Sequence, residues 1–552
     1  MDSLAEKIKP FLKGDIVYDE STLATYSRDA SLFSLRPRAV IFPKDTEDVK
    51  AVVKFVNEER KEDPSLYITA RSAGTDMSGG AIGESIILDF TRYMNKLKKF
   101  EGSLAVVEPG MYYRDFEKET LKRGLILPSY TASKSINAVG GMVGNNSGGE
   151  LSLVYGQTQK YIEKLRVVLG DGNEYTVGKL TQKELEEKMV QQDFEGELYR
   201  KIHNLVSENY DVIQKARPDV SKNASGYFLW NVWDKKFFDL AQVLVGSQGT
   251  LGIVTEITFR LVPTFPHTKL LAVFMDDVQR LSDITVALLR FRPTSLESYD
   301  NNTLRIAIKY FPEIVRAMGV INVLALAVSL LPDIWILLKS VLHGKGLPDL
   351  IILTEFAGDN EEDLKTQVLE AQSALRVLGV TARVARSKED AEKYWTIRRQ
   401  SFSLLRKHIR GKKTAPFIDD MIVRPEKMGE FLPRLYAILR QYPSLIYTIA
   451  GHIGNGNFHI IPLMDLKNEA ARKIIPELAD KVYSLVLEFQ GSITAEHNDG
   501  LIRSPYLKKM YGEKVFGLFE KTKNIFDPLN IFNRGKKVGS SLDYALKHIA
   551  YD

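Results

Sequence analysis

Three glycine-rich segments, each beside an apolar run typical of a β-strand, limit the folds that this chain can adopt. The segments are residues 71–81, 128–149 and 245–254, and all three combine glycine with serine and threonine. Small residues of this kind let backbone N–H groups gather around an anion, as a bound pyrophosphate requires. Three such segments within about two hundred residues predict one large ligand that contains phosphate, and a dinucleotide fits better than a mononucleotide.

The first segment matches neither of the two common phosphate-binding motifs. It follows the strand-like run 66–70 and precedes another at 85–89. A P-loop ends in Gly-Lys-Ser/Thr, and a Rossmann fingerprint opens a helix, whereas this segment connects two strands. By itself this segment would be interpreted as an ordinary glycine-rich turn. Together with the other two segments it is better interpreted as part of a ligand-binding site.

The elements before the first segment follow the order strand, helix, strand. Residues 1–35 are expected to form a short amphipathic helix and an irregular lead-in, after which 38–42 is a short apolar strand. An amphipathic helix is predicted over 46–59 with Thr46 as its N-cap. No fixed period indicates a repeat array.

The run Ile446 to Pro462 predicts a β-hairpin that carries two histidines. Asn455-Gly456 is the strongest short hairpin signal, because a type I′ turn needs a positive φ at both central residues. A turn centred there places His452 and His459 directly opposite each other on one face. Two imidazoles in this arrangement are a start for a divalent-metal site, although two ligands do not make one.

A second polar pair, Glu496-His497, follows about forty residues later. Glu496 offers a carboxylate ligand and His497 a titratable imidazole. Neighbours in an extended segment point to opposite sides, so that one can bind a metal while the other faces a substrate. This combination favours a metal site over a hairpin with incidental histidines. Its nitrogen and oxygen ligands suit zinc, with manganese or ferrous iron as alternatives.

Length and composition restrict the remaining function classes. At 552 residues the chain exceeds one hydrophobic core, so two or more domains are expected. Its formal charge of +5 is small for this length and gives no reason to expect nucleic-acid binding. Because the chain has no cysteine, disulfides, cysteine-ligated metal centres and thiol catalysis are excluded.

One apolar stretch, 317–338, tests whether the chain crosses a membrane. Asn322, Pro332 and Asp333 interrupt it, and no uninterrupted run reaches the roughly 20 residues that a span needs. Since the amino terminus also lacks the apolar core of a signal peptide, we expect a cytoplasmic protein. Basic residues around the stretch leave open a peripheral contact with the inner face of the membrane, beside burial as a helical hairpin.

In this order and context, the three segments resemble the FAD-binding domain of the vanillyl-alcohol oxidase or PCMH type. The second half resembles the FAD-linked oxidase cap of the D-2-hydroxyacid dehydrogenases, in the branch of D-lactate dehydrogenase and the glycolate oxidase large subunit. The likeness covers about residues 35–540. It implies an α+β chain with a helical lead-in over 1–35, a two-part PCMH-type FAD-binding domain over 36–264, an antiparallel-sheet FAD-linked oxidase cap over 265–500 with an apolar insertion near 315–345, and a C-terminal helical segment over 501–552 that returns to the FAD domain.

The resemblance also implies which residues contact FAD. The first segment would wrap the pyrophosphate, the second would line the isoalloxazine and ribityl side, and the third would close over the flavin. The implied residues are Arg71, Ser72, Ala73, Gly74, Thr75, Asp76 and Ser78; Thr131, Ser133, Gly140, Gly141, Asn145 and Ser147; and Gly246, Thr250, Gly252, Ile253 and Val254. Some relatives attach FAD through a histidine in the first segment, which has none here, so noncovalent FAD is implied.

In the second half, the resemblance implies His452, His459 and Glu496 as metal ligands and His497 as the general base. A 2-hydroxy acid also needs a cation for its carboxylate. Arg398 matches the family's Trp-x-x-Arg element, and a guanidinium can grip a carboxylate with two bonds.

The remaining polar candidates in this half are weaker. Lys413 and Asn457 are possible substrate contacts, and Asp419-Asp420 is interpreted as a turn that enters a strand rather than as an acid–base pair. Ile460-Ile461 follows the second histidine, where relatives that prefer dicarboxylic acids carry a polar residue. This difference favours a short substrate side chain such as that of lactate.

The predicted function is FAD-dependent oxidation of a D-2-hydroxy acid, D-lactate favoured, to the 2-oxo acid, with hydride transfer to flavin N5. Electrons would pass to a non-NAD acceptor such as a quinone, a cytochrome or an electron-transfer flavoprotein. Alternatives on the same fold are a glycolate or D-2-hydroxyglutarate dehydrogenase and a flavin-dependent ether-lipid synthase without net redox turnover. An alternative from another class is a flavin-carrying electron-transfer subunit. The sequence does not decide among these acids, acceptors and metals, and it does not give the oligomeric state.

Overall fold

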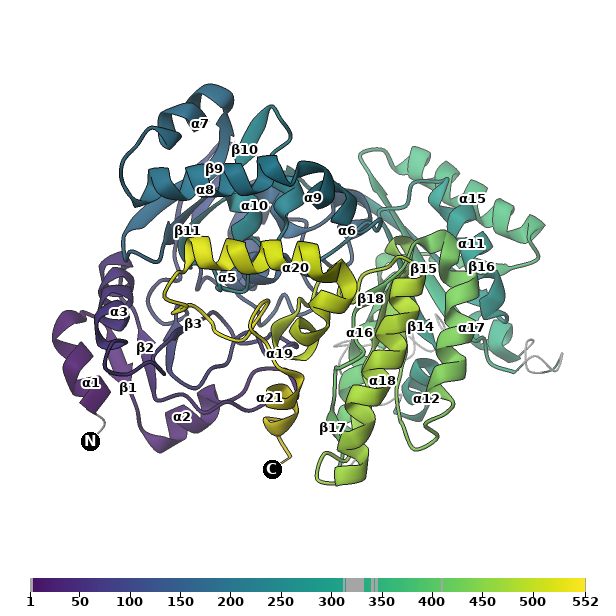
Figure 1. Ribbon diagram of the computed structural model, residues 1–552. Helices are drawn as coiled ribbons and strands as arrows, with labels where there is room; N and C mark the ends of the chain where they lie inside the picture. Colours follow the sequence, from purple (N-terminus) through teal and green to yellow (C-terminus); the bar gives the residue numbers. More distant parts are fainter. Residues whose placement is uncertain are drawn as a thin grey trace.

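The computed structural model describes residues 3–310, 313, 332–338, 342, 346–408 and 411–551, and the side chains at 307 and 400–408 are outside the description. Two lobes lie side by side in Figure 1, the first purple to blue and the second green. The first lobe contains a four-stranded and a six-stranded sheet, and the second a seven-stranded antiparallel sheet. Helices packed on separate sheets confirm the predicted α+β class.

No helix within the described ranges is long and apolar enough to span a membrane. Most of the apolar stretch 317–338 lies outside those ranges, so its predicted membrane contact stays a prediction.

The four-stranded sheet has the order β1-β2-β4-β3. Its parallel strands are β2 (Ala39–Phe42), β4 (Ile86–Asp89) and β3 (Ile68–Arg71). Helix α3 (Thr46–Glu59) connects β2 with β3 and buries its apolar face in the same core. The N-cap of α3 is Asp45 rather than Thr46, because the Asp45 carboxylate accepts from two backbone N–H groups of the first turn.

The lead-in over 1–35 is only partly helical. It contains α1 (Ser3–Ile8) and α2 (Glu20–Tyr26), but β1 (Asp15–Val17) lies between them and pairs antiparallel with β2. The lead-in therefore adds an edge strand to the sheet, because pairing with β2 satisfies backbone groups of both strands.

The six-stranded sheet is antiparallel and forms the second part of the first lobe. Its strands, in spatial order, are β10 (Phe237–Asp239), β9 (Glu174–Thr181), β8 (Ile162–Val168), β11 (Ile253–Arg260), β6 (Leu104–Val107) and β5 (Leu97–Glu101). The third glycine segment leads directly into β11. The second segment contains α5 (Val139–Asn145), and the backbone N–H of Gln248 donates to the carbonyl of Gly144. The second and third segments therefore lie side by side.

The second lobe is built on the seven-stranded sheet. In spatial order its strands are β16 (Thr381–Val384), β13 (His267–Met275), β15 (Leu350–Gly358), β14 (Ser295–Asp300), β19 (Ile449–His452), β20 (Asn457–Ile460) and β18 (Met421–Ile422). One face forms a large core with α11 (Leu281–Leu289), α15 (Glu361–Val377), α17 (Met428–Leu439) and α18 (Glu469–Glu488). On the other face, α12 (Asn301–Lys309) and α16 (Lys388–His408) pack over β13, β14 and β15.

The histidine hairpin forms, but its register differs from the prediction. His452 pairs with Asn457 and Ala450 pairs with His459, so residues 453–456 form the loop. The type I′ prediction is wrong, because of the two central residues only Gly456 has a positive φ, of 76°. The register is shifted by two residues, and side chains alternate with period two. His452 and His459 therefore still share one face, as diagonal neighbours rather than as a direct pair.

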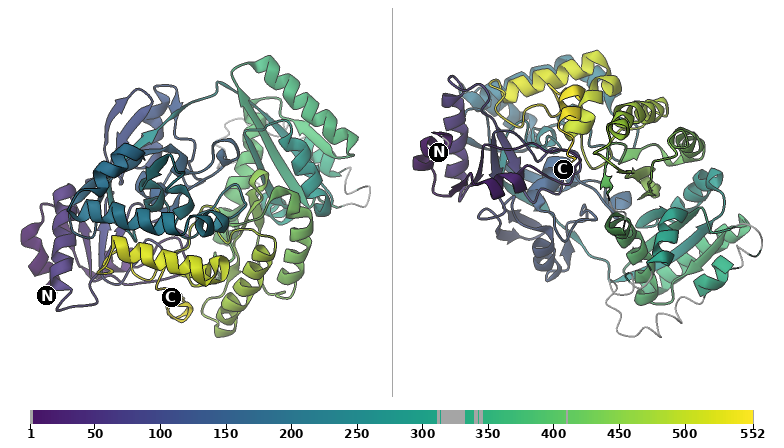
Figure 2. Two further views of the ribbon diagram at one scale, coloured as in Figure 1. Left: turned by 45° about the horizontal axis from the view of Figure 1, so that its top comes forward. Right: turned by 90° about the horizontal axis from the view of Figure 1, so that it is seen from below.

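The C-terminal part of the chain packs on the first lobe. Helix α20 (Leu507–Phe526), yellow in Figure 1, runs beside α8 (Phe194–Glu208) and contacts it, as the two views of Figure 2 also show. Beyond α20, the side-chain amide of Asn533 donates to the carbonyls of Gly80 and Gln248. This residue holds the first and third glycine segments together.

Candidate active site

A cavity of about 780 Å³ lies between the two lobes. The glycine segments form the wall of the first lobe, and side chains of β19, β20 and α16 belong to the wall of the second. The predicted residues that line the cavity are Arg71, Ser72, Ala73, Gly74, Thr75, Asp76, Thr131, Ser133, Gly140, Gly141, Asn145, Ser147, Gly252, Val254, Arg398, His452, His459, Glu496 and His497. The fold thus brings the predicted cofactor segments to the predicted metal ligands and base.

Six predicted residues do not line the cavity: Ser78, Gly246, Thr250, Ile253, Asn457 and Lys413. The first five are buried behind its walls. Lys413 is exposed on a separate two-stranded sheet that pairs β17 (Lys413–Thr414) with β21 (Leu463–Met464). Lys413 does not line the cavity, and its contact with the substrate stays a prediction.

The first-lobe wall has polar groups and space that fit FAD. Within the described part of the chain, no backbone N–H group from 73 to 77 donates to another protein group, so this stretch is available to an anion. Among the described residues, a Cβ on Gly141 would meet only Ser72, at 3.9 Å, in a wall that faces the cavity. Asn137 also lines the cavity, and its side-chain oxygen is buried without a partner among the described residues. The first segment offers no histidine for covalent attachment.

A polar network holds the segments together. Asp76 accepts from Ser78 and from the side-chain amide of Asn145. Gln248, which the sequence did not single out, donates to Ser78 and Asn145 and accepts from the backbone N–H of Gly500. The network thereby connects the cofactor segments with the part of the second half that carries the predicted base.

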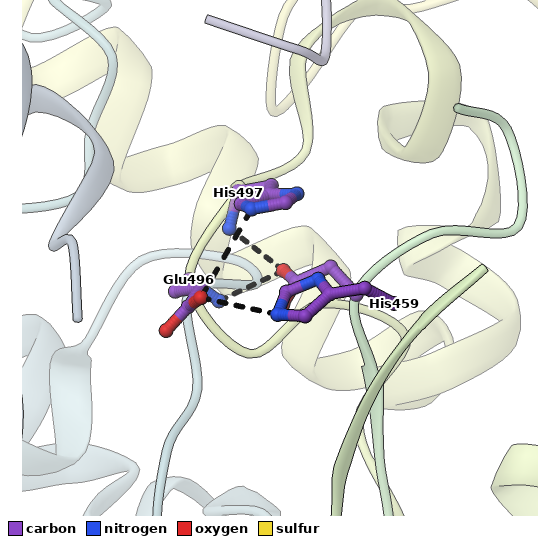
Figure 3. Close-up of side chains that lie close together, drawn as sticks. His459, Glu496 and His497 are labelled. Atoms are coloured by element: carbon purple, nitrogen blue, oxygen red, sulfur yellow. Dashed lines mark hydrogen bonds and ion pairs between the residues drawn. The ribbon is translucent and has the colours of Figure 1, made fainter. Parts of the chain in front are cut away.

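Three imidazoles converge on one carboxylate oxygen in the second-lobe wall. Oε1 of Glu496 lies 3.0 Å from Nε2 of His452, 3.4 Å from Nε2 of His459 and 4.0 Å from Nε2 of His497. Figure 3 shows the side chains of His459 and His497 close to that of Glu496, with dashed lines marking their contacts. The rings of His459 and His497 are stacked, with centroids 4.9 Å apart. The hairpin and the Glu-His segment therefore bring four potential metal-ligand atoms into one small volume.

The other ring nitrogens are held by buried carboxylates. An oxygen of Glu297 lies 2.7 Å from Nδ1 of His452. Asp419 gives one oxygen to each of two rings, 3.1 Å from Nδ1 of His459 and 2.6 Å from Nδ1 of His497. A carboxylate at Nδ1 fixes the tautomer that leaves the Nε2 lone pair free, which is the usual support of a metal-binding histidine.

Asp420 holds the backbone of the Glu-His segment. One of its oxygens accepts from the backbone N–H groups of Glu496 and His497 and from the Thr494 hydroxyl. Asp420 does occupy a turn, with a φ of 68°. The interpretation of Asp419-Asp420 as a strand-entry turn is nevertheless incomplete, because both carboxylates are buried within the site.

Lys222, from the first lobe, supplies a buried positive charge to the second-lobe cluster. Its Nζ lies 2.8 Å from Oε2 of Glu496 and 2.7 Å from the side-chain oxygen of Asn457. The Lys222 side chain is fully buried. Because Lys222 binds Oε2, the other oxygen of Glu496 is the one that faces the histidines.

The cluster has a negative potential that favours a cation. Burial alone would lower the pKa of His459, but its bonds to Asp419 and Glu496 outweigh burial and raise it to about 10. Burial also opposes a charge on His497, yet Asp419 raises its pKa above the ordinary value. Burial would raise the pKa of Glu496, whereas Lys222 and the imidazoles hold it well below its usual range. A site that favours protons at its imidazoles can take a divalent ion in their place.

Two candidate ligand sets share His459 and Glu496. The predicted set adds His452, and the other adds His497 and Asp420, whose potential ligand atoms lie within 4.8 Å of those of His459 and Glu496. The His452 side chain is 5% exposed and that of His497 is 23% exposed. The deeper histidine suits a ligand, and the more exposed one suits a group that meets a substrate in the cavity.

Two neighbouring arginines of α16 reach the cavity. Arg398 pairs with Glu297, and its Nε is buried without a partner in the described part of the chain. Arg399 is held by Glu150 of the first lobe through two bonds of 3.1 and 2.8 Å. A guanidinium nitrogen without a partner can bind a carboxylate ligand, whereas Arg399 already has a carboxylate partner, so Arg398 is the better candidate of the two.

Several functional positions were missed from the sequence. Glu297, Lys222 and Gln248 carried no usable signal, because each is a common polar residue whose burial depends on distant segments. Asp419-Asp420 did carry one, an acidic pair placed directly before an apolar run.

Two protein families match the chain. Residues 37–178 match the family described as "FAD binding domain", and residues 265–537 match the family described as "FAD linked oxidases, C-terminal domain". The first range contains two of the glycine segments, and the second contains the whole histidine and carboxylate cluster.

Individual proteins show the same similarity. A D-2-hydroxyglutarate dehydrogenase of Pseudomonas putida is 27% identical over 548 residues, which cover 95% of this chain and 50% of the relative, so the chain spans about half the length of that relative. A D-lactate dehydrogenase of Archaeoglobus fulgidus is 26% identical over 542 residues, covering 98% of this chain and 99% of the relative. Among solved structures, a 4-ethylphenol oxidase from Gulosibacter chungangensis superimposes with a TM-score of 0.68 at 17% identity, covering 97% of both chains, which shows a shared fold.

Proposed function

Since this chain belongs to the PCMH-type flavoproteins that join an FAD-binding domain to an FAD-linked oxidase C-terminal domain, we propose that it oxidises a D-2-hydroxy acid to the 2-oxo acid, with D-lactate favoured. The observation that carries the proposal is that one cavity is lined by the FAD-fitting wall, by the three converging imidazoles and by Arg398, whose Nε has no partner among the described residues. An acceptor of the quinone, cytochrome or electron-transfer flavoprotein class would then reoxidise the flavin.

Each residue of the site has its own role in the proposed reaction. Arg398 binds the substrate carboxylate and thereby orients the Cα–H bond. His452, His459 and Glu496 would hold one divalent metal, zinc favoured, with manganese or iron as alternatives. When bound, the metal supplies a Lewis acid for the hydroxyl oxygen and FAD supplies the hydride acceptor. His497, held at Nδ1 by Asp419, takes the hydroxyl proton at Nε2 as the general base.

Ile461 supports a substrate with a short side chain. It lines the cavity, whereas Ile460 is buried in the core on the opposite face of the sheet. An apolar group at this place would desolvate a second carboxylate without compensating it. D-2-Hydroxyglutarate is the second candidate, because the Pseudomonas putida relative is named for it and because Arg399 offers another cation in the cavity.

An anaerobic substrate panel tests the proposal. Holoprotein is mixed with D-lactate, L-lactate, glycolate or D-2-hydroxyglutarate, with and without a metal chelator, and the loss of oxidised-flavin absorbance is followed. We expect reduction by D-lactate but not by L-lactate, suppression by the chelator, and recovery when zinc, manganese or iron is added. No reduction by any acid would refute the dehydrogenase, and reduction unaffected by the chelator would refute the metal's role.

A further inference from the structure

One buried carboxylate contacts both halves of the proposed site. Glu297 is 1% exposed. Its Oε1 lies 2.7 Å from Nδ1 of His452, a proposed metal ligand, and its Oε2 pairs with Nη2 of Arg398, the proposed substrate cation.

The sheet register explains the contact with His452. Tyr299 of β14 pairs with Ala450 of β19, and continuing this antiparallel register places Glu297 opposite His452. Opposite side chains on one face of a sheet are close neighbours, so the two side chains meet.

Helix packing explains the contact with Arg398. Tyr299, on the same face of β14 as Glu297, packs in one core cluster with Trp395 of α16. Arg398 lies three residues after Trp395, close to one helical turn, and so falls on the same side of α16. The face of the sheet that carries Glu297 is therefore the face onto which α16 brings the guanidinium.

The Glu297 carboxylate has partners that compensate its buried negative charge. A carboxylate this deeply buried is stable only when it is paired, and Glu297 has one partner on each oxygen. When His452 donates from Nδ1 to Glu297, its Nε2, which lies 3.0 Å from Oε1 of Glu496, is the ring nitrogen that remains for a metal. Arg398, held through Nη2, lines the cavity, and its Nε has no partner among the described residues.

We propose that Glu297 is a positioning residue that serves both halves of the site at once. It holds His452 in the tautomer that binds a metal through Nε2, and it holds Arg398 with a free edge for a substrate carboxylate. Glu297 itself touches neither metal nor substrate. The inference rests on the proposed function, since it needs a metal at His452 and a carboxylate at Arg398.

The test compares Glu297→Gln, which keeps the shape and removes the charge, with Glu355→Gln as a matched control. Glu355 is a half-buried carboxyl on the adjacent strand β15, and its nearest charged neighbours are Glu150 and Arg399. Zinc affinity is measured by competition with a chromophoric chelator, and pyruvate binding by the change it causes in the oxidised-flavin spectrum. We expect Glu297→Gln to weaken zinc binding about 10- to 100-fold and pyruvate binding about tenfold, with Glu355→Gln unchanged in both.

Glu297→Asp keeps the charge on a shorter side chain and carries the test if Glu297→Gln fails to fold. It should retain one of the two affinities and lose the other, because it cannot reach both partners. Parental affinity for both zinc and pyruvate in a folded Glu297 variant overturns the inference, as does an equal loss in Glu355→Gln.

Flavin reduction by D-lactate is recorded for the unmutated protein in the same series. If the unmutated protein shows normal flavin reduction while the variant binds zinc and pyruvate like the parent, only the role of Glu297 fails. If the unmutated protein shows no flavin reduction although it binds zinc and pyruvate, only the proposed reaction fails.

Discussion

Asp419 accepts a hydrogen bond from Nδ1 of His497 over 2.6 Å. The other oxygen of the same carboxylate binds His459, and Asp419 is fully buried. A single side chain therefore orients both the proposed base and a proposed metal ligand, from a position that the sequence showed only as part of a turn.

Asp419→Asn is expected to slow flavin reduction by D-lactate about 10- to 100-fold while FAD stays bound. The amide has one oxygen instead of two, so it can accept from only one of the two imidazoles. Anaerobic stopped-flow absorbance measures the rate, and the flavin released on denaturation measures FAD content. Asp465→Asn, at an exposed turn, is the control and should keep the parental rate. Equal rates in the two variants would remove Asp419 from the site.

Lys222→Met is expected to lower the free energy of unfolding by about 3–5 kcal/mol, because it leaves Glu496 buried without its cation. Denaturant titration of metal-free protein measures the change. The control is Lys473→Met, which breaks an exposed pair with Glu469 and should leave stability unchanged. A Lys222→Met protein as stable as the parent would show that the pair between the lobes contributes nothing.

Ile461→Ala is expected to raise kcat/KM for D-2-hydroxyglutarate relative to D-lactate about tenfold, since it opens the cavity beside His459. Steady-state kinetics with both acids measure the ratio. The matched control is the preceding Ile460→Ala, which should destabilise the fold by about 2–5 kcal/mol and leave the ratio unchanged, because Ile460 faces the core. A ratio that moves equally in both variants would contradict the placement of Ile461.

Glu355 is expected to make stability fall between about pH 5 and pH 7. Burial, reinforced by the charge of Glu150, raises the pKa of Glu355 to about 7 from an ordinary value of 4.5. Between those values the unfolded chain releases the proton and the folded chain keeps it, so unfolding becomes easier as pH rises and the effect levels off above 7. The full difference is about 3 kcal/mol. Denaturant titrations across this range should show the fall in the parent and lose it in Glu355→Gln; the same slope in both would assign it to other groups.

The histidine hairpin shows which structural features a local sequence pattern can predict. Asn455-Gly456 correctly predicted a turn between two strands, and the alternation of strand side chains correctly placed His452 and His459 on one face. The turn type and the register were wrong, because the pairing of β20 with β18 and of β19 with β14 also contributes to the register, and neither partner is visible in the hairpin's own sequence.

The sequence by itself determined the α+β class, the three glycine segments and the donor atoms of the cluster, because these depend on periodicity, on turn chemistry and on residue type. Only the tertiary structure decided that Lys222 of the first lobe neutralises Glu496, and that Glu297, 155 residues before His452, orients it. The physical reason is that the burial of a charge and its pairing across distant segments are set by the packing of the whole chain, and they leave no local pattern in the sequence.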